Sequence, residues 1–352
     1  MFKNVIYLFV AFYKNQDLHT MSTSGSTGTP FTVVQDKRKR SRVIAELKLF
    51  GELCGYKSHE KMAFLRVLSE KTRKKRYIEF IENIYRLDTS SLNNESLERI
   101  NNFIRSKRVQ AILSYSSTLE LLARFIQDNN YTSRDYNVRS VIAGGEALDI
   151  ETRRRLKDVF GERCMVVSRY SNQEMGILAQ DTGENSKFIL NHGSYYFECL
   201  KIDSDEPAEM GEVGRLVITD LFNYAFPMIR YDTGDLGIIE KDDNHQWPVL
   251  KEIYGKQQDV IYSTKGEPVS PFSIAIYMWQ VKGVSQWQFI QETESEYILK
   301  INGKQNRDLD KIVELMRNLL GKDANITINY VDEIPVLASN KQRRTVCKIQ
   351  KS

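Results

Sequence analysis

Residues Ser22 to Pro30 read Ser-Thr-Ser-Gly-Ser-Thr-Gly-Thr-Pro, a run without a single hydrophobic side chain. Apart from two glycines and one proline, every residue in it is Ser or Thr, so it has nothing to bury and is expected to be a loop. Gly25 and Gly28 allow backbone conformations closed to other residues, and they let the main chain approach a ligand closely. Exposed N–H groups and hydroxyls in such a loop suit a phosphate.

The residues around this loop limit what it can be. After Pro30 the chain reads Phe31-Thr32-Val33-Val34, a short strand candidate, and residues 37 to 54 are predicted to form a helix. The loop lacks the Gly-Lys-Ser/Thr ending of a Walker P-loop and the Gly-x-Gly-x-x-Gly of a dinucleotide fingerprint. Its composition also suits a flexible linker. Composition alone therefore leaves a phosphate loop and a linker both open.

Length and composition are those of an ordinary globular protein. The 352 residues are enough for about two domains, and 41% hydrophobic with 27% charged residues allow a sizeable core. The net charge of +4 does not require nucleic acid as a partner. The basic runs at 37–40 and 71–76 are expected to be solvated helix faces, with anion binding as the alternative.

Cysteine usage and the N-terminal residues suggest a compartment. The four cysteines form no Cys-x-x-Cys pair and the four histidines form no cluster, so neither a zinc site nor a disulfide framework is indicated. The apolar run Val5–Tyr13 is far too short to span a bilayer, and no small-x-small cleavage site follows it. We expect a buried element there, no membrane span, and a reduced, cytoplasmic setting.

Hydrophobic periodicity changes along the chain. Residues 36–130 read as mainly helical, with Asn93 or Asn94 capping one helix. Alternating elements follow, with strands at 111–115, 138–143 and 164–168 and helices at 118–128 and 149–160. Residues 188–239 read as short strands, and 260–352 as a small α+β unit with a helix at 308–320. The predicted fold class is α/β: mostly parallel sheets covered by helices, a short-stranded β region, and a small C-terminal α+β domain.

Five later segments, together with the Ser22–Pro30 loop, form an ordered series of motifs. They are Gly144-Gly145-Glu146-Ala147-Leu148, Tyr170-Ser171-Asn172-Gln173-Glu174, PMIRYDTGD at 227–235, GKQQDVI at 255–261 and SNKQRR at 339–344. The series resembles that of the adenylate-forming (AMP-binding, acyl-CoA synthetase) superfamily. PMIRYDTGD, preceded by GEVGRLVITDL, is most similar to the phenylacetate–CoA ligase and CapK branch, the latter found with surface-polysaccharide biosynthesis.

The resemblance implies a role for each motif residue. The β- and γ-phosphates of ATP would lie on Ser24, Gly25, Ser26, Thr27 and Gly28. Adenine would be bound by Gly145, Glu146 and Tyr170, and the ribose hydroxyls by Asp235. Glu174 and Thr27 would hold Mg²⁺, which prefers oxygen ligands. Lys256, where the family usually has Arg, would contact ribose or phosphate. Lys341 would be catalytic, as would Glu174, with the lysine stabilising charge that develops in the transition state.

The resemblance also implies a reaction and a domain division. A carboxylic acid would be adenylated by ATP with release of pyrophosphate, and the acyl group would pass to an acceptor, CoA by resemblance. An amine or hydroxyl on a sugar, or a carrier thiol, stays open as the acceptor, and so does a homodimer. Residues 1–257 would form a large ATP-binding domain, shortened at its N-terminus, and residues 258–352 a small mobile domain that carries the lysine.

Three alternatives accompany this prediction. The chain could be a catalytically silent nucleotide-binding or scaffold protein, or a subunit that needs a separate N-terminal partner. Asp-Thr-Gly also occurs twice, at 181–183 and 232–234, as it does in aspartic proteases, where two carboxylates share one proton. The polar residues beside both copies and the α/β alternation argue against a protease.

Overall fold

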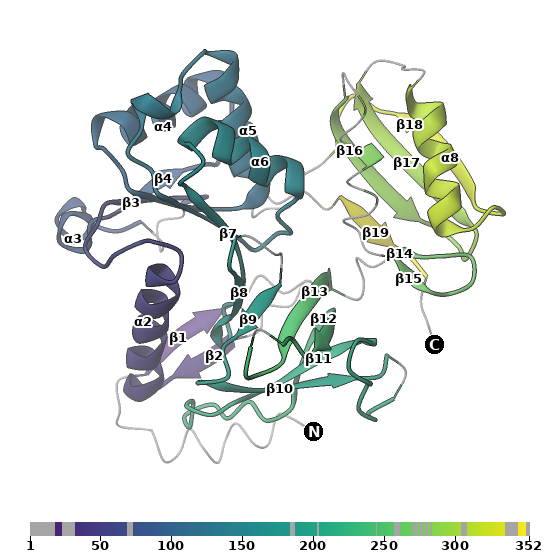
Figure 1. Ribbon diagram of the computed structural model, residues 1–352, viewed down its shortest axis with the longest axis horizontal. Helices are drawn as coiled ribbons and strands as arrows, with labels where there is room; N and C mark the ends of the chain where they lie inside the picture. Colours follow the sequence, from purple (N-terminus) through teal and green to yellow (C-terminus); the bar gives the residue numbers. More distant parts are fainter. Residues whose placement is uncertain are drawn as a thin grey trace.

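The computed structural model contains two larger sheets and two small two-stranded ones among the residues it describes (Figure 1). It describes residues 18–22, 32–68, 73–183, 187–202, 204–243, 245–256, 261–269, 274, 277–278, 281, 284–303, 308–334 and 344–349. Within these residues the larger sheet has eleven strands in the order β10-β11-β12-β13-β9-β8-β7-β6-β5-β3-β4, and a four-stranded sheet belongs to the C-terminal part.

One half of the large sheet is parallel. Its strands are β3 Met62–Arg66, β4 Ile84–Asp88, β5 Ala111–Ser114, β6 Ser140–Gly144 and β7 Met165–Asn172. Three helices cover one face: α4 Asn94–Ser106, α5 Ser116–Asp128 and α6 Ile150–Phe160. The helix α3 Arg76–Glu82 and the short 3-10 helix η1 Ser133–Asp135 lie in the connections.

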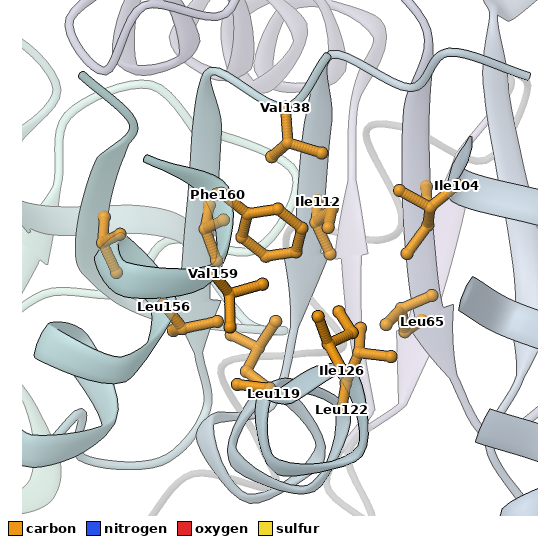
Figure 2. Packing of buried hydrophobic residues seen from close by; sticks show 14 of the residues in the cluster. Leu65, Ile104, Ile112, Leu119, Leu122, Ile126, Val138, Leu156, Val159 and Phe160 are labelled. Atoms are coloured by element: carbon orange, nitrogen blue, oxygen red, sulfur yellow. The ribbon is translucent and has the colours of Figure 1, made fainter. Parts of the chain in front are cut away.

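The core of this half lies between the three helices and the sheet (Figure 2). Leu122 and Ile126 of α5 and Leu156 of α6 are fully buried in one cluster with Ile112 of β5. Truncating such a leucine to Ala typically costs about 2–5 kcal/mol. The packing therefore fixes the helices against the strands, and with them the loops at the carboxyl ends of the strands, where ligands bind in such folds.

The other half of the large sheet is antiparallel, and it includes the strands expected between residues 188 and 239. Its strands are β8 Gly176–Asp181, β9 Phe188–Leu190, β10 Tyr195–Leu200, β11 Val213–Asp220, β12 Tyr231–Glu240 and β13 Val249–Lys256. β7 joins the two halves, because it pairs parallel with β6 through Arg169 and antiparallel with β8 from Arg169 onward.

A hairpin and a helix flank the predicted phosphate loop. β1 His19–Ser22 pairs antiparallel with β2 Thr32–Gln35, and Ser22 lies opposite Thr32. The chain therefore leaves β1 and enters β2 at the same point, and residues 23–31 between them lie outside the described residues. The helix α2 Lys37–Glu52 follows and begins at the cap Asp36, whose carboxylate accepts a hydrogen bond from Lys39 N at 2.7 Å.

The C-terminal part has its own sheet and core. The four-stranded sheet has the order β18-β17-β16-β19, with β16 Val284–Gln291, β17 Glu296–Gly303, β18 Asn325–Tyr330 and β19 Thr345–Cys347. α8 Asp308–Leu320 packs on it through Met316, which shares a buried cluster with Phe289 and Leu299. A two-stranded sheet of β14 Ile261–Tyr262 and β15 Pro268–Val269 precedes it. This arrangement confirms the predicted fold class.

The structure adds to one expectation from the sequence and corrects another. Residues 36–130 are mainly helical as predicted, but they also contain the parallel strands β3 and β4. The basic run 37–40 is not wholly a solvated face, because Lys39 is fully buried. The apolar run Val5–Tyr13 lies outside the described residues. No helix in the part of the chain that the structure describes is long and apolar enough to cross a membrane.

Candidate active site

Tyr170 and Asp235, which come from two separate sequence motifs, meet in the structure. Tyr170 Oη donates a hydrogen bond of 2.6 Å to Asp235 Oδ2, although 65 positions separate the two residues. Tyr170 lies on β7 and Asp235 on β12, four steps apart in the strand order. At about 4.8 Å per step a flat sheet would hold these strands roughly 19 Å apart. The antiparallel half must therefore curl back toward β7.

Buried side chains inside the curl support this geometry. One buried cluster joins side chains from four different strands of the antiparallel half, and Tyr170 packs against it. It includes Leu190, Leu216, Ile239 and Leu250. Burial of the Tyr170 hydroxyl, with the neighbouring Asp235 carboxylate as a second cause, raises the pKa of Tyr170 well above its usual value. The phenol therefore stays protonated and remains a hydrogen-bond donor at neutral pH.

The residues just before Asp235 shape the backbone that presents it. Gly234 has a φ of +70°, a left-handed conformation that favours glycine, and its N–H donates to Asp232 Oδ1 at 2.8 Å. The Thr233 hydroxyl donates to Leu216 O at 2.8 Å and accepts from Asp235 N at 3.1 Å. In the Thr-Gly-Asp motif, then, Thr233 and Gly234 set the turn that presents the buried Asp235 carboxylate to Tyr170.

Glu174 lies in the turn between β7 and β8, where it contacts Tyr231 and Gln35. Its carboxylate accepts a hydrogen bond of 3.4 Å from Tyr231 Oη, and its carbonyl accepts one of 3.5 Å from Gln35 Nε2. Tyr231 is on β12, four residues before Asp235, so both motif residues of the β7–β8 hairpin contact the same strand. Burial and the nearby Glu174 carboxylate raise the pKa of Tyr231.

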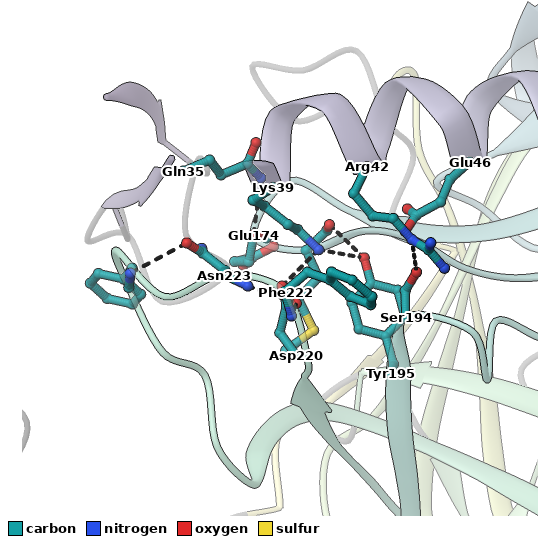
Figure 3. A network of polar contacts seen from close by, with 12 residues as sticks. Gln35, Lys39, Arg42, Glu46, Glu174, Ser194, Tyr195, Asp220, Phe222 and Asn223 are labelled. Atoms are coloured by element: carbon teal, nitrogen blue, oxygen red, sulfur yellow. Dashed lines mark hydrogen bonds and ion pairs between the residues drawn. The ribbon is translucent and has the colours of Figure 1, made fainter. Parts of the chain in front are cut away.

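A buried polar network, which the sequence did not reveal, fastens α2 to the turn that carries Glu174 (Figure 3). Lys39 Nζ pairs with Asp220 Oδ2 at 2.7 Å, and neither side chain has any exposed surface. Lys39 Nζ also donates to Tyr195 Oη at 2.9 Å, and Tyr195 Oη donates to Met175 O at 2.6 Å. Through this chain of contacts the first turn of α2 fixes the residue that follows Glu174.

Further contacts hold β2 and the C-terminal end of α2. Asn223 Nδ2 donates to Val34 O at 3.0 Å. Near the other end of α2, Gln180 Nε2 donates to Phe50 O at 2.9 Å while Gln180 Oε1 accepts from Arg169 Nε at 2.9 Å. Burial lowers the pKa of Arg169 to about 10, so the guanidinium is still charged at neutral pH. The helix α2 is thus anchored at both ends.

Gly145 and Glu146, expected at the adenine, lie in the loop after β6. Gly145 has a φ of +75°, which explains why glycine stands at this turn. Glu146 Oε2 accepts from Ser117 N at 2.9 Å, and Glu146 O accepts from Ser116 Oγ at 3.2 Å. In these contacts Glu146 satisfies a free N–H group at the start of α5. Its predicted contact with a nucleotide stays a prediction.

The two Asp-Thr-Gly segments do not form a protease dyad. Asp181, on β8, pairs with Arg153 of α6, and Asp232, on β12, pairs with Arg215 of β11. Each carboxylate has its own arginine, and two strands lie between β8 and β12. This geometry is incompatible with two carboxylates that share one proton.

Of the remaining predicted site residues, the structure describes only the backbone of Lys256. Ser24, Gly25, Ser26, Thr27, Gly28 and Lys341 lie outside the described residues. The backbone of Lys256 ends β13 and lies opposite Asp235 in the strand register, so two of the motifs are neighbours. Among the described residues no group of three or more His, Cys, Asp or Glu side chains could hold a metal ion. A magnesium ion bound with phosphate oxygens and water needs only one or two carboxylates, and Glu174 fits that requirement.

One ion pair links the C-terminal part to the large sheet region. Arg344 Nη2 lies 2.9 Å from Glu120 Oε2 on α5, and the guanidinium also stacks over Trp287, 5.7 Å from the ring centroid. Arg344 follows the predicted lysine by three positions. α5 is the helix whose first turn contacts Glu146.

Comparisons with known proteins give the fold and one family match. Residues 261–348 match the CapK C-terminal domain family. No curated protein matches this chain. Among solved structures, 2-hydroxyisobutyryl-CoA ligase in the postadenylation state in complex with 2-HIB-AMP has a TM-score of 0.75 at 17% identity, covering 98% of this chain and 79% of that one.

Two further solved structures show the same fold. ATP-bound MatB from Rhodopseudomonas palustris has a TM-score of 0.66 at 13% identity, covering 91% of this chain and 65% of that one. O-succinylbenzoate coenzyme A synthetase (MenE) from Bacillus subtilis, in complex with AMP, has a TM-score of 0.65 at 15% identity, covering 92% and 67%. The chain therefore has the fold of these CoA ligases, and its residues 261–348 resemble the CapK C-terminal domain.

Proposed function

We propose that this protein adenylates a carboxylic acid with ATP and then transfers the acyl group to CoA. The observation that carries the proposal is the contact between Tyr170 and Asp235, because it joins two motifs whose residues would bind one nucleotide. The Glu174–Tyr231 contact and the register between Lys256 and Asp235 bring three further motif positions to the same place. The fold shared with CoA ligases supports the same reaction.

In the first half-reaction an oxygen of the substrate carboxylate attacks the α-phosphorus of ATP. The bond from that phosphorus to the oxygen bridging to the β-phosphate breaks, and pyrophosphate leaves. Asp235 would accept the ribose hydroxyls, with Tyr170 beside the adenine, and the Ser24–Gly28 loop would hold the β- and γ-phosphates. Mg²⁺ on Glu174, with Thr27 as the second predicted ligand, would supply charge neutralisation for the phosphates.

In the second half-reaction a sulfur nucleophile attacks the acyl carbon, and AMP leaves with the electrons of the acyl–phosphate bond.

We propose that Lys341 stabilises the charge that develops in the transition state of the first half-reaction. The Arg344–Glu120 ion pair supports this role, because a segment three residues long spans at most about 11 Å. The pair holds Arg344 against α5, whose first turn contacts the loop that bears Glu146.

The finer assignment follows the sequence motifs. We propose a phenylacetate–CoA ligase or CapK type of enzyme, with a boundary near residue 257 between a large nucleotide-binding domain and a small domain. The match of residues 261–348 to the CapK C-terminal domain supports the CapK type, and the role in surface-polysaccharide biosynthesis rests on the sequence resemblance. An acceptor on a sugar or a carrier thiol would fit the same chemistry in place of CoA.

The test is acid-dependent exchange of labelled pyrophosphate into ATP, across a panel of aryl, short-chain and sugar-linked carboxylic acids. Asp235→Asn removes the charge that would hold the ribose hydroxyls. Since hydrogen bonds to charged groups contribute about 1.5–3 kcal/mol, the KM for ATP should rise about 10- to 100-fold. Lys341→Ala should abolish exchange while nucleotide binding persists.

Asp232→Asn is the matched control. It changes the same residue type three positions earlier in the same motif, but its carboxylate faces Arg215 rather than Tyr170. Its KM for ATP should stay within about twofold of wild type, because partly exposed ion pairs contribute little. Nucleotide binding without exchange for any acid would refute the enzyme and favour a silent nucleotide-binding protein.

A further inference from the structure

The short helix α3 exposes an apolar face that the proposed reaction does not use. Tyr77, Phe80 and Ile81 are 60%, 72% and 69% exposed, although side chains of this kind are normally buried. Their spacing of three and four positions places them on one face of the helix. None of the residues of α3 is buried. The face is therefore held out into solvent rather than packed on the sheet.

A run of four basic residues, Arg73 to Arg76, leads into the same helix. The acidic residues of α3 neutralise only Lys74 within this run, because their other ion pairs are with Arg86. Glu82 lies 2.7 Å from Lys74 and 3.0 Å from Arg86, and Glu79 lies 3.8 Å from Arg86.

Three cations remain beside the apolar face. Arg73, Lys75 and Arg76 are exposed, and none lies within ion-pair distance of an acidic residue that the structure describes, although Arg73 is near enough to Asp88 to help lower the pKa of that carboxyl. We call these three cations, together with Tyr77, Phe80 and Ile81, the α3 patch. In Figure 1, α3 lies at the outer side of the molecule beside β3. β4, which follows α3 in the chain, is the last strand at this end of the large sheet.

We propose that the α3 patch docks this protein onto membrane surfaces that carry anionic lipids. Aromatic and aliphatic side chains on one face of a helix, with Lys and Arg beside them, are the combination that binds the boundary between headgroups and acyl chains. The cations would lie against the anionic headgroups, while Tyr77, Phe80 and Ile81 enter the apolar boundary. Because the helix has only seven residues, the protein would lie on the membrane reversibly and would not span it.

Charge complementarity favours a lipid surface over a protein partner. Lys is depleted in the centres of protein interfaces, whereas here Lys75 stands close in sequence to the apolar residues. A nucleic-acid partner would use the cations but would leave three large apolar side chains without a role. The lipid surface is the partner that uses both halves of the patch.

The test is cosedimentation of the full chain with sucrose-loaded vesicles. Vesicles of phosphatidylcholine with about 30% phosphatidylglycerol should bind the protein, and vesicles of phosphatidylcholine alone should not. Each basic residue near such a surface strengthens binding by about fivefold, so K75E/R76E should weaken it by about 25-fold or more. F80S/I81S should weaken it by about tenfold or more, since it removes most of the apolar surface.

Matched controls separate the patch from general effects of charge and polarity. M210S changes an apolar residue that is 58% exposed in another part of the chain. R163E/K322E reverses two exposed cations away from α3. Both controls should bind vesicles as wild type does. In an F80W variant, the added indole should shift its emission to shorter wavelengths only with the anionic vesicles.

The proposal is overturned if wild type ignores the anionic vesicles, or if F80S/I81S binds them as wild type does. It is equally overturned if light scattering shows a dimer that both patch variants convert to monomers while no vesicle binding occurs, because the patch would then be a contact between two copies. These outcomes are independent of pyrophosphate exchange, so failure here leaves the proposed reaction untouched.

Discussion

Replacing Lys39 by Met should destabilise the protein strongly, because it leaves a buried carboxylate without its cation. Lys39 and Asp220 are both fully buried, and their charged atoms are 2.7 Å apart. In the variant Asp220 Oδ1 keeps its hydrogen bonds from Phe222 N at 2.9 Å and Asn223 N at 3.2 Å, but Oδ2 loses the ammonium. Breaking one partner of such a pair costs about 3–5 kcal/mol.

The double variant Lys39→Met/Asp220→Asn separates the cost of the unpaired Asp220 carboxylate from the net contribution of the ion pair to stability. With both charges gone, no uncompensated charge remains, and replacing a whole buried pair by uncharged residues is often close to neutral. The oxygen of the new amide side chain at position 220 could still accept the two backbone hydrogen bonds. We therefore expect the double variant to recover most of the stability that the single variant loses, with a coupling energy of about 2 kcal/mol or more.

Urea unfolding followed by far-UV circular dichroism measures these free energies. Lys37→Met, on the exposed side of the same helix turn, is the control and should change stability by less than about 0.5 kcal/mol. A loss below about 1 kcal/mol for Lys39→Met would refute the reasoning. So would a double variant that is no more stable than the single one.

Two further perturbations test the network and the C-terminal contact. Burial raises the pKa of Glu46 despite the nearby Lys39 and Arg42, so the folded state binds a proton more tightly than the unfolded one, and stability falls as pH rises past the unfolded value near 4.5. Glu46→Gln should therefore raise the melting temperature at about pH 7 to 8 and lose this advantage toward about pH 4; equal melting temperatures across this range would contradict the shift. Glu120→Gln, which breaks the ion pair with Arg344, should slow pyrophosphate exchange about fivefold. Arg124→Gln, which removes the other cation on Glu120, should leave the rate unchanged.

Helices whose formation depends on neighbouring residues, through apolar periodicity and capping side chains, could be predicted from the sequence. Helix α8 spans the predicted residues 308–320, because its apolar periodicity is undisturbed. Asn93 was one of two predicted caps, and its side chain accepts from Ser96 N at 3.0 Å. Strands β3 and β4 were missed, and for β4 the reason is physical. β4 is an edge strand without a fully buried residue, so it lacks the continuous apolar run by which a buried strand is recognised.

The buried network could not be predicted, because its cause is not local. Lys39 stands in a run of four basic residues, and such runs are usually solvated. Its hydroxyl partner Tyr195 is 156 positions away and its carboxylate partner Asp220 lies further still. Nothing near either partner marks it as buried. Only the curl of the antiparallel strands, which no pattern in the sequence encodes by itself, brings them under α2.

The same curl explains why the motif residues need the network. The turn that carries Glu174 is held by the packing of Met175, which is buried in one cluster with Val33 and Ile218. Packing of this kind fixes the position of the turn but does not fix α2 along its axis. The directional contacts from Lys39 through Tyr195 to Met175 O add that constraint. The network therefore sets the spacing between α2 and Glu174, the predicted magnesium ligand. A loss of activity in Lys39→Met at temperatures where the protein is still folded would therefore reflect this spacing.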